Sequence, residues 1–194
     1  RHFTTFVFNK IQGADLSLES VEELRPSFRE AFTLRHREGL NVGEIAGRHF
    51  ELVVSAGCKA AKWIANKEPE ADRAGVEKLM RALERVTAER FVSISTIDVY
   101  PRPIEVDEGF EPALADGQPY GRHRLELEHF VRARFANALI VRLPGLFGAG
   151  LKKNAIYDFL HDNRLDLIHQ DGQFQFYDLE CIETDVQRCL AAGL

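Results

Sequence analysis

A strand, a helix and a second strand follow one another between residues 52 and 95, and this order restricts the fold more than any other feature. Residues 52–57 form an apolar, β-branched run that ends in small residues, as a buried strand does. Apolar side chains then recur at helical spacing from Val76 to Val86, before a second β-branched run at 91–95. Parallel strands need a crossover of this length, usually a helix. The sequence therefore predicts an α/β fold with a right-handed βαβ unit.

Further strands and helices are expected on both sides of this unit. Residues 3–8 predict a first strand, and Ser17 or Ser20 is expected to cap a helix that runs to Phe32. The other expected elements are a strand-and-turn section at 33–42, a loop or short helix at 63–69, a helix from Tyr120 to Phe135, a strand at 138–143, a turn-rich exit at 144–150, a helix from Asn154, a hairpin of 165–169 with 174–177, and a last helix at 185–190. Because strands alternate with helices, we expect a mainly parallel sheet with helices on both faces.

Composition excludes several classes of protein. The 194 residues are enough to bury the core of one domain, and their formal charge of −5 argues against general nucleic-acid binding. The cysteines, Cys58, Cys181 and Cys189, lack metal-type spacing, and an odd number without a secretory signal predicts a reducing cytoplasm. The histidines show no metal spacing either, and no apolar run is long enough to span a membrane. We therefore expect a cytoplasmic protein with no metal site and no membrane contact.

A hydroxyl-rich strand end and a tyrosine carry the candidate chemistry. Ser95 and Thr96 end the strand at 91–95, and Tyr120 opens the helix that follows. Arg124 lies four residues after Tyr120, so the two side chains share one helix face. A nearby cation favours the ionised form of a phenol, and such a tyrosine can transfer a proton. The alternative is that Tyr120 only anchors the helix and that Arg124 is a surface charge.

Several motifs occur together and in order. They are Ser95-Thr96, Val99-Tyr100, Tyr120 with a basic residue four positions later, and the run at 138–148. Together they resemble the extended short-chain dehydrogenase/reductase family, the NAD(P)-dependent sugar-nucleotide epimerases and dehydratases. The resemblance covers about three quarters of the chain, from Phe50 onward. It implies a single doubly wound, Rossmann-like domain over residues 1–194, in which about 145–194 form a short, reduced substrate-side extension.

The resemblance also implies a role for each matching residue. In the family a Tyr is the general acid/base, the cation binds the nicotinamide ribose, and a Ser or Thr binds the same substrate oxygen as the Tyr. Carried over, the catalytic residues are Thr96, Tyr120 and Arg124, with Ser95 as the alternative hydroxyl. The implied cofactor is NAD or NADP, contacted by Ala56, Gly57, Ser95, Tyr120, Arg124 and Pro144. The implied residues for a nucleotide-sugar substrate are Thr96, Lys152 and Lys153. Gly57 could equally belong to a plain strand exit, and Lys152-Lys153 to an ordinary helix start.

The chain departs from the family pattern at three places. The family has Lys where Arg124 stands, and the planar fork of Arg differs in shape from a compact ammonium group. The family often has Asn where Gly75 stands. Residues 9–15 contain one glycine instead of the glycine-rich turn that holds the pyrophosphate. Either that turn lies upstream of Arg1, where we expect further residues because the sequence does not begin with Met, or the first strand is only structural.

Two functions follow from these observations. The leading hypothesis is an NAD(P)-dependent epimerase, dehydratase or reductase that acts on a sugar-nucleotide-like substrate. The second is a non-catalytic relative that keeps the fold for binding or assembly. The acidic loop at 101–119 either shapes a substrate cleft or is an ordinary surface loop. A homodimer paired through helices is a further implication of the resemblance.

Overall fold

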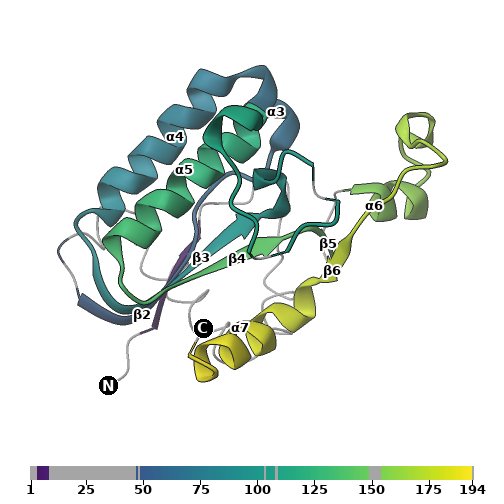
Figure 1. The fold of residues 1–194 in the computed structure, drawn as a ribbon. Coiled ribbons are helices and arrows are strands. Elements are labelled where there is room, and N and C mark those ends of the chain that lie inside the picture. Colours follow the sequence, from purple (N-terminus) through teal and green to yellow (C-terminus); the bar gives the residue numbers. More distant parts are fainter. Residues whose placement is uncertain are drawn as a thin grey trace. The chain divides into compact units, whose positions relative to one another are not determined.

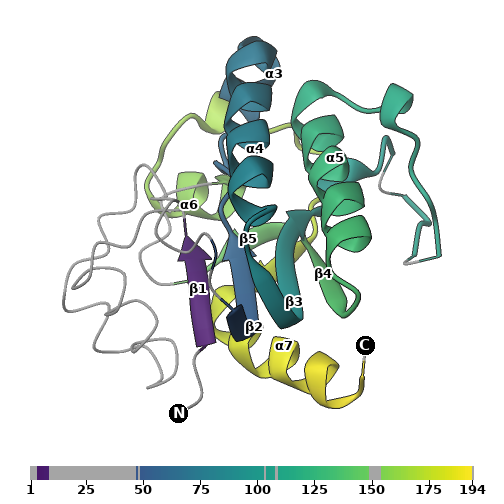
Figure 2. The ribbon, with the colours of Figure 1, turned by 90° about the vertical axis from the view of Figure 1, so that its left-hand side faces the viewer.

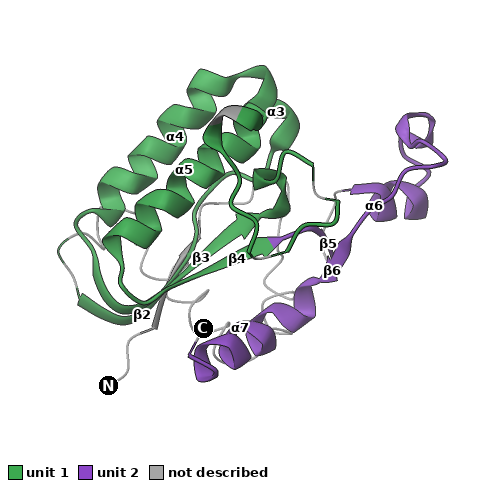
Figure 3. Ribbon diagram, viewed as in Figure 1, with its two compact units in different colours: residues 1–11, 30–142 green, residues 12–29, 143–194 purple. Residues whose placement is uncertain are grey.

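The computed structural model describes residues 4–8, 47, 49–102, 104–107, 109–148 and 154–193. The described residues form two compact units, one ending at Arg142 and one beginning at Leu143 (Figure 3). Some predictions fall outside the described residues: the helix from Ser17 or Ser20, the section at 33–42, the turn at 9–15, and Lys152-Lys153.

The first unit is built on a four-stranded sheet in the order β1-β2-β3-β4 (Figure 1; Figure 2 labels all four strands). The strands are β1 (Thr4–Phe8), β2 (His49–Ala56), β3 (Thr87–Thr96) and β4 (Ala138–Leu143). Both β1 and β3 pair in parallel with β2. The predicted strands and the predicted βαβ unit are therefore confirmed, as is the Rossmann-like α/β class.

Helices cover one face of this sheet (Figure 2). They are α3 (Lys62–Lys67), α4 (Pro69–Leu83) and α5 (Pro119–Arg134). Pro69 and Pro119 stand in the first helical turns, where a backbone N–H has no intrahelical partner to lose. The apolar stripes of α4 and α5 pack on the strands in one core, made of Phe50, Val53, Val76, Leu79, Leu83, Val86, Phe91, Leu127, Val131 and Phe135. The stripes expected from helical spacing are confirmed.

At Gly121, helix α5 lies very close to the backbone of another segment, at Asp98. A Cβ atom built on Gly121 would lie 1.9 Å from the carbonyl oxygen of Asp98. Asp98 belongs to η1 (Ile97–Val99), the short 3₁₀ turn that directly follows β3. Only a residue without a side chain allows this contact, and the contact fixes the first turn of α5 beside the end of β3.

We expect Gly121→Ala to lower the free energy of unfolding by about 1–3 kcal/mol, because the backbone must move to admit the methyl group. Gly75→Ala is the matched control, since Gly75 also lies inside a helix but a Cβ there meets nothing within 4 Å. That variant should gain up to about 1 kcal/mol from the higher helix propensity of alanine. Urea unfolding measures both variants. Equal changes in the two would contradict the steric argument.

In its described residues, the second unit contains short elements only. They are β5 (Gly145–Phe147), α6 (Asn154–Leu160), the 3₁₀ turn η3 (Leu165–Leu167), β6 (Phe176–Asp178), the 3₁₀ turn η4 (Leu179–Cys181) and α7 (Ile182–Ala191). The predicted cap is present, since the side-chain oxygen of Asn154 accepts from the backbone N–H of Ile156 at 3.0 Å. The helices expected from Asn154 and at 185–190 are therefore confirmed. No helix in the described ranges is long and apolar enough to cross a membrane.

The hairpin predicted at 165–177 is wrong. Residues 165–167 form η3, and β6 pairs in parallel with β5 instead. Arg164, with a φ of 50°, takes the chain through a left-handed conformation before η3, so no strand begins there. Leu165 and Leu167 are exposed, although their alternation with polar residues indicated a half-buried strand. The turn-rich exit expected after β4 contains strand β5.

Candidate active site

The candidate residues of the first unit lie where β3 ends and α5 begins. Thr96 is the last residue of β3, Tyr120 lies in the first turn of α5, and Arg124 follows one turn later. The guanidinium carbon of Arg124 stands 4.0 Å from the ring centroid of Tyr120. Both side chains are buried. The prediction that these two residues share one helix face is confirmed, and the cation lies over the ring of the tyrosine.

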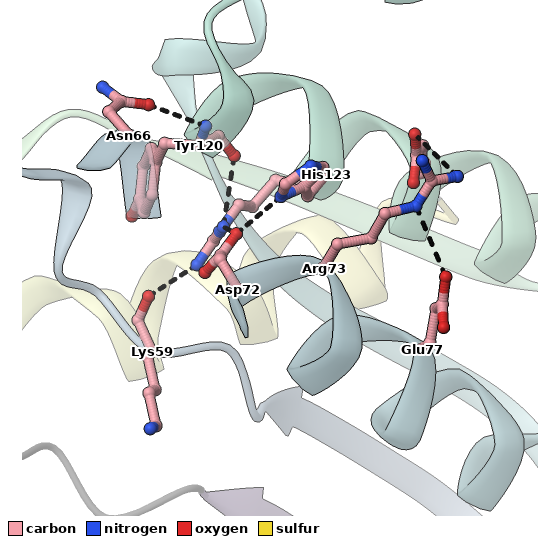
Figure 4. A network of polar contacts seen from close by, with 9 residues as sticks. Lys59, Asn66, Asp72, Arg73, Glu77, Tyr120 and His123 are labelled. Atoms are coloured by element: carbon pink, nitrogen blue, oxygen red, sulfur yellow. Dashed lines mark hydrogen bonds and ion pairs between the residues drawn. The ribbon is translucent and has the colours of Figure 1, made fainter. Parts of the chain in front are cut away.

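Arg124 is held by three acceptors. Its Nη1 donates to the carboxylate of Asp72 and, at 3.3 Å, to the backbone carbonyl of Tyr120. Its Nη2 donates to the backbone carbonyl of Lys59 at 2.6 Å (Figure 4). The remaining nitrogen, Nε, is buried without a partner among the described residues. Arg124 therefore ties α5 to α4 and to the loop after β2, and it is not a surface charge.

Asp72 lies at the centre of this buried cluster (Figure 4). Its Oδ2 atom binds Arg124 and also lies 2.8 Å from Nδ1 of His123. Burial by itself raises the pKa of the carboxyl group, but hydrogen bonds from Arg124 and His123 outweigh burial and lower the pKa of Asp72. Asp72 is therefore ionised at neutral pH and balances the buried guanidinium.

The lowered pKa of Asp72 predicts a pH-dependent contribution to stability. A carboxyl group whose pKa is lower in the folded state contributes fully above its unfolded pKa, and loses the contribution as the pH falls through its folded pKa. Asp72→Asn should therefore destabilise the protein most near neutral pH, and the difference from the unmodified protein should shrink in acid. Urea unfolding between about pH 7 and about pH 3 measures this difference. The control is Glu70→Gln, an exposed residue of the same helical turn. A difference that stays constant with pH would contradict the assignment.

Tyr120 is fixed through its backbone and keeps its hydroxyl available. Its N–H donates to the side-chain oxygen of Asn66 at 2.9 Å, whereas its hydroxyl has no hydrogen-bond partner among the described residues. Burial raises the pKa of the phenol, the charge of Arg124 lowers it, and negative groups led by Asp98 raise it again, so the pKa of Tyr120 is raised. Arg124 lowers the pKa of Tyr120, as expected, but burial and the negative groups together raise it by more. The phenol is protonated at neutral pH and can donate a proton.

The two hydroxyls at the end of β3 differ in their partners. Ser95 Oγ donates to the carboxylate of Glu128 at 2.5 Å. Thr96 Oγ1 donates to Oδ2 of Asp98 at 3.2 Å and accepts from the backbone N–H of Asp98 at 3.1 Å. Ser95 therefore belongs to a buried network. Thr96 keeps one lone pair for another donor.

Glu128 and Arg142 form a buried ion pair that the sequence analysis missed. Arg142 Nη2 lies 2.7 Å from Glu128 Oε2, and Arg142 Nη1 donates to the hydroxyl of Tyr100 at 2.8 Å. That hydroxyl in turn donates to the backbone carbonyl of Asp107 at 3.2 Å. The network joins α5, β4 and the loop after β3. The position of Glu128 four residues after Arg124, on the same helix face, was the available signal.

Ala56, Gly57 and Pro144 were also expected to contact the cofactor. Ala56 is half-buried at the end of β2. A Cβ atom on Gly57 would lie 3.0 Å from a methyl carbon of Leu79, so the packing of α4 explains the glycine there. Pro144 belongs to the second unit and is half-buried. No group of three or more His, Cys, Asp or Glu residues in the described part of the chain could hold a metal ion.

Comparison with known proteins gives two findings. The model of the NAD dependent epimerase/dehydratase family matches residues 32–170. A UDP-glucuronic acid 4-epimerase from Bacillus cereus, solved with NAD, is 18% identical with a TM-score of 0.65, covering 97% of this chain and 73% of that chain. A dTDP-4-dehydrorhamnose reductase from Clostridium acetobutylicum is 18% identical with a TM-score of 0.60, covering 98% of this chain and 71% of that one. At this identity the likeness shows the fold. A search of curated proteins found no match.

Proposed function

The chain belongs to the NAD-dependent epimerase/dehydratase family, and from this membership we propose that it is an NAD(P)-dependent enzyme acting on a nucleotide sugar. The reaction is an epimerisation, a dehydration or a reduction. The observation that carries the proposal is the phenol of Tyr120, which is held by its helix, is protonated, and has no partner for its hydroxyl among the described residues. The similar Bacillus cereus enzyme is a UDP-glucuronic acid 4-epimerase solved with NAD, which supports this choice of cofactor and substrate class.

In this proposal the chain's own residues manage the proton. The bound dinucleotide supplies or accepts the hydride. Tyr120 keeps its proton at neutral pH and gives it to the sugar oxygen as negative charge develops there. Thr96 accepts a hydrogen bond from a second hydroxyl of the sugar through its remaining lone pair. The two residues act from the end of β3 and the start of α5, which the close contact at Gly121 holds together.

The residues at the phenol of Tyr120 and at the strand ends fit NAD(P). Position 124, however, has Arg where the family has Lys. Both terminal nitrogens of Arg124 already donate to acceptors within the protein, which are Asp72 and two backbone carbonyls. The two terminal nitrogens are therefore committed to the protein before a ribose arrives, whereas Nε keeps its hydrogen without a partner among the described residues. We assign Arg124 the role of a positioning residue, which holds the ring of Tyr120 and the loop after β2.

The commitment of Arg124 also favours a second candidate function. A family member without a free ammonium group beside its tyrosine could retain the fold for ligand binding or assembly alone. In that case a dinucleotide or a nucleotide sugar binds without turnover, or neither binds.

Calorimetry with NAD+ and NADP+ tests the proposal most directly. We expect one of them to bind with a Kd below about 1 mM. Conversion of UDP-sugars with the preferred dinucleotide, followed by chromatography, then tests turnover. Absence of binding up to millimolar dinucleotide would refute the enzymatic function, and binding without any turnover would favour the second candidate.

The chain spans part of the length of the epimerases that it resembles. This chain covers 73% and 64% of two of the UDP-glucuronic acid 4-epimerase chains. The role of residues 145–194 as a reduced substrate-binding portion, and that of Lys152 and Lys153 within it, stay proposals. A cytoplasmic location, a homodimer and the lack of nucleic-acid binding stay predictions as well.

A further inference from the structure

Lys62 on helix α3 and Asp98 in η1 form a charged pair beside Tyr120. Lys62 and Asn66 lie one turn apart on α3 and so share a face. Asn66 accepts from the backbone N–H of Tyr120 at 2.9 Å, and Lys62 Nζ donates to Oδ1 of Asp98 at 2.6 Å. The carbonyl of Asp98 is the group that meets Gly121, the residue next to Tyr120. Lys62 and Asp98 therefore lie against the same helical turn as the candidate phenol.

The other carboxylate oxygen of Asp98 orients Thr96. Asp98 Oδ2 accepts the hydroxyl hydrogen of Thr96, and the backbone N–H of Asp98 occupies one lone pair of the same hydroxyl. A hydroxyl has one hydrogen and two lone pairs. With Asp98 ionised and in place, Thr96 can only accept a further hydrogen bond. It can therefore bind a sugar hydroxyl but cannot donate to a ketone oxygen until Asp98 releases it.

Only some of the charged groups around Tyr120 can change their partners. The groups that act on its phenol are Arg124 from α5, Asp72 from α4, Cys58 from the loop after β2, and Asp98 from η1. Arg124 and Asp72 form a closed, buried pair. Burial, above all, raises the pKa of Cys58 to about 11, so its thiol is neutral at pH 7. Lys62 and Asp98 have exposed side-chain fractions of 54% and 31%, so this pair can change partners when a ligand arrives.

We propose that Asp98, held by Lys62, is a positioning residue that orients the Thr96 hydroxyl and places an adjustable negative charge beside Tyr120. This inference rests on the proposed function, because Asp98 positions groups for a reaction only if Tyr120 and Thr96 meet the substrate. The expected effect of the Asp98 charge on Tyr120 does not require turnover.

A fluorine titration measures this coupling directly. The protein is produced with 3-fluorotyrosine, whose ring fluorine lowers the intrinsic pKa of the phenol, and the ¹⁹F signal of Tyr120 is assigned with Tyr120→Phe. Asp98→Asn should move the titration of Tyr120 to lower pH, because it removes a negative charge. Lys62→Met should move it to higher pH, because the charge of Asp98 is no longer balanced. Lys62→Arg should restore the original curve.

Lys67→Met is the matched control, since Lys67 lies on the same helix, is exposed, and has no ion pair among the described residues. Its curve should coincide with that of the unmodified protein. Coincident curves for Asp98→Asn, Lys62→Met and Lys67→Met would overturn the proposal. So would a Tyr120 signal in Asp98→Asn that stays unchanged up to the pH of unfolding. If Asp98→Asn fails to fold, the two lysine variants decide the question. The titration needs no cofactor, so its failure is distinct from a failure of dinucleotide binding.

Discussion

Replacing Glu128 by Ala should lower the free energy of unfolding by about 3–5 kcal/mol, the usual cost of breaking a buried ion pair on one side. The side chain of Glu128 is 1% exposed and that of Arg142 is 12% exposed. Without the carboxylate, the guanidinium of Arg142 stays buried with no opposite charge, and the hydroxyl of Ser95 loses its acceptor.

Two controls separate this cost from a general effect of removing a glutamate. Glu77→Ala removes a carboxylate that pairs with arginines on the exposed face of α4, so it should cost less than about 1 kcal/mol. The double variant Glu128→Met/Arg142→Met removes both charges and should recover much of the loss, because an apolar pair needs no counter-charge. Urea unfolding measures all three variants. A loss for Glu128→Ala no larger than that for Glu77→Ala would contradict the assigned burial.

The elements of the first unit could be predicted because their signals are local. Val76, Leu79 and Leu83 repeat at helical spacing, and residues 91–95 are continuously apolar or small, so each segment reveals its own buried face. The same reasoning failed at Leu165 and Leu167. The alternation of apolar and polar residues there is typical of a strand. A strand also needs a pairing partner, and β6, which lies in the expected partner segment, pairs with β5 instead.

The candidate site could be predicted in its residues but not in its contacts. Tyr120 and Arg124 were recognisable from their spacing alone. The direction of the guanidinium depends on Asp72, which lies 52 residues before Arg124 in the sequence, and on a backbone carbonyl at Lys59. No local pattern reports such a partner. The sequence therefore predicted a cation beside the phenol, whereas the fold decides that this cation lies over the ring and that the pKa of Tyr120 is raised.

If Tyr120 is the proton donor of the proposed reaction, Tyr120→Phe should lower kcat about 10²–10⁴-fold with the nucleotide sugar, because a general acid contributes a factor of this size. The free energy of unfolding should change little. Phenylalanine keeps the ring under the guanidinium of Arg124 and the backbone bond to Asn66, and the lost hydroxyl has no hydrogen bond among the described residues.

Tyr100→Phe provides the opposite case and completes this prediction. Its hydroxyl accepts from Arg142 at 2.8 Å and donates to the carbonyl of Asp107 at 3.2 Å, so its removal should cost about 2 kcal/mol of stability. Its effect on kcat should be small, because Tyr100 packs beneath the loop and contacts no proposed reacting group. Urea unfolding and turnover are measured for both variants. Full activity in Tyr120→Phe would remove this residue from the chemistry. Equal losses of activity in the two variants would mean that the hydroxyl of Tyr120 has a structural role and does not transfer the proton.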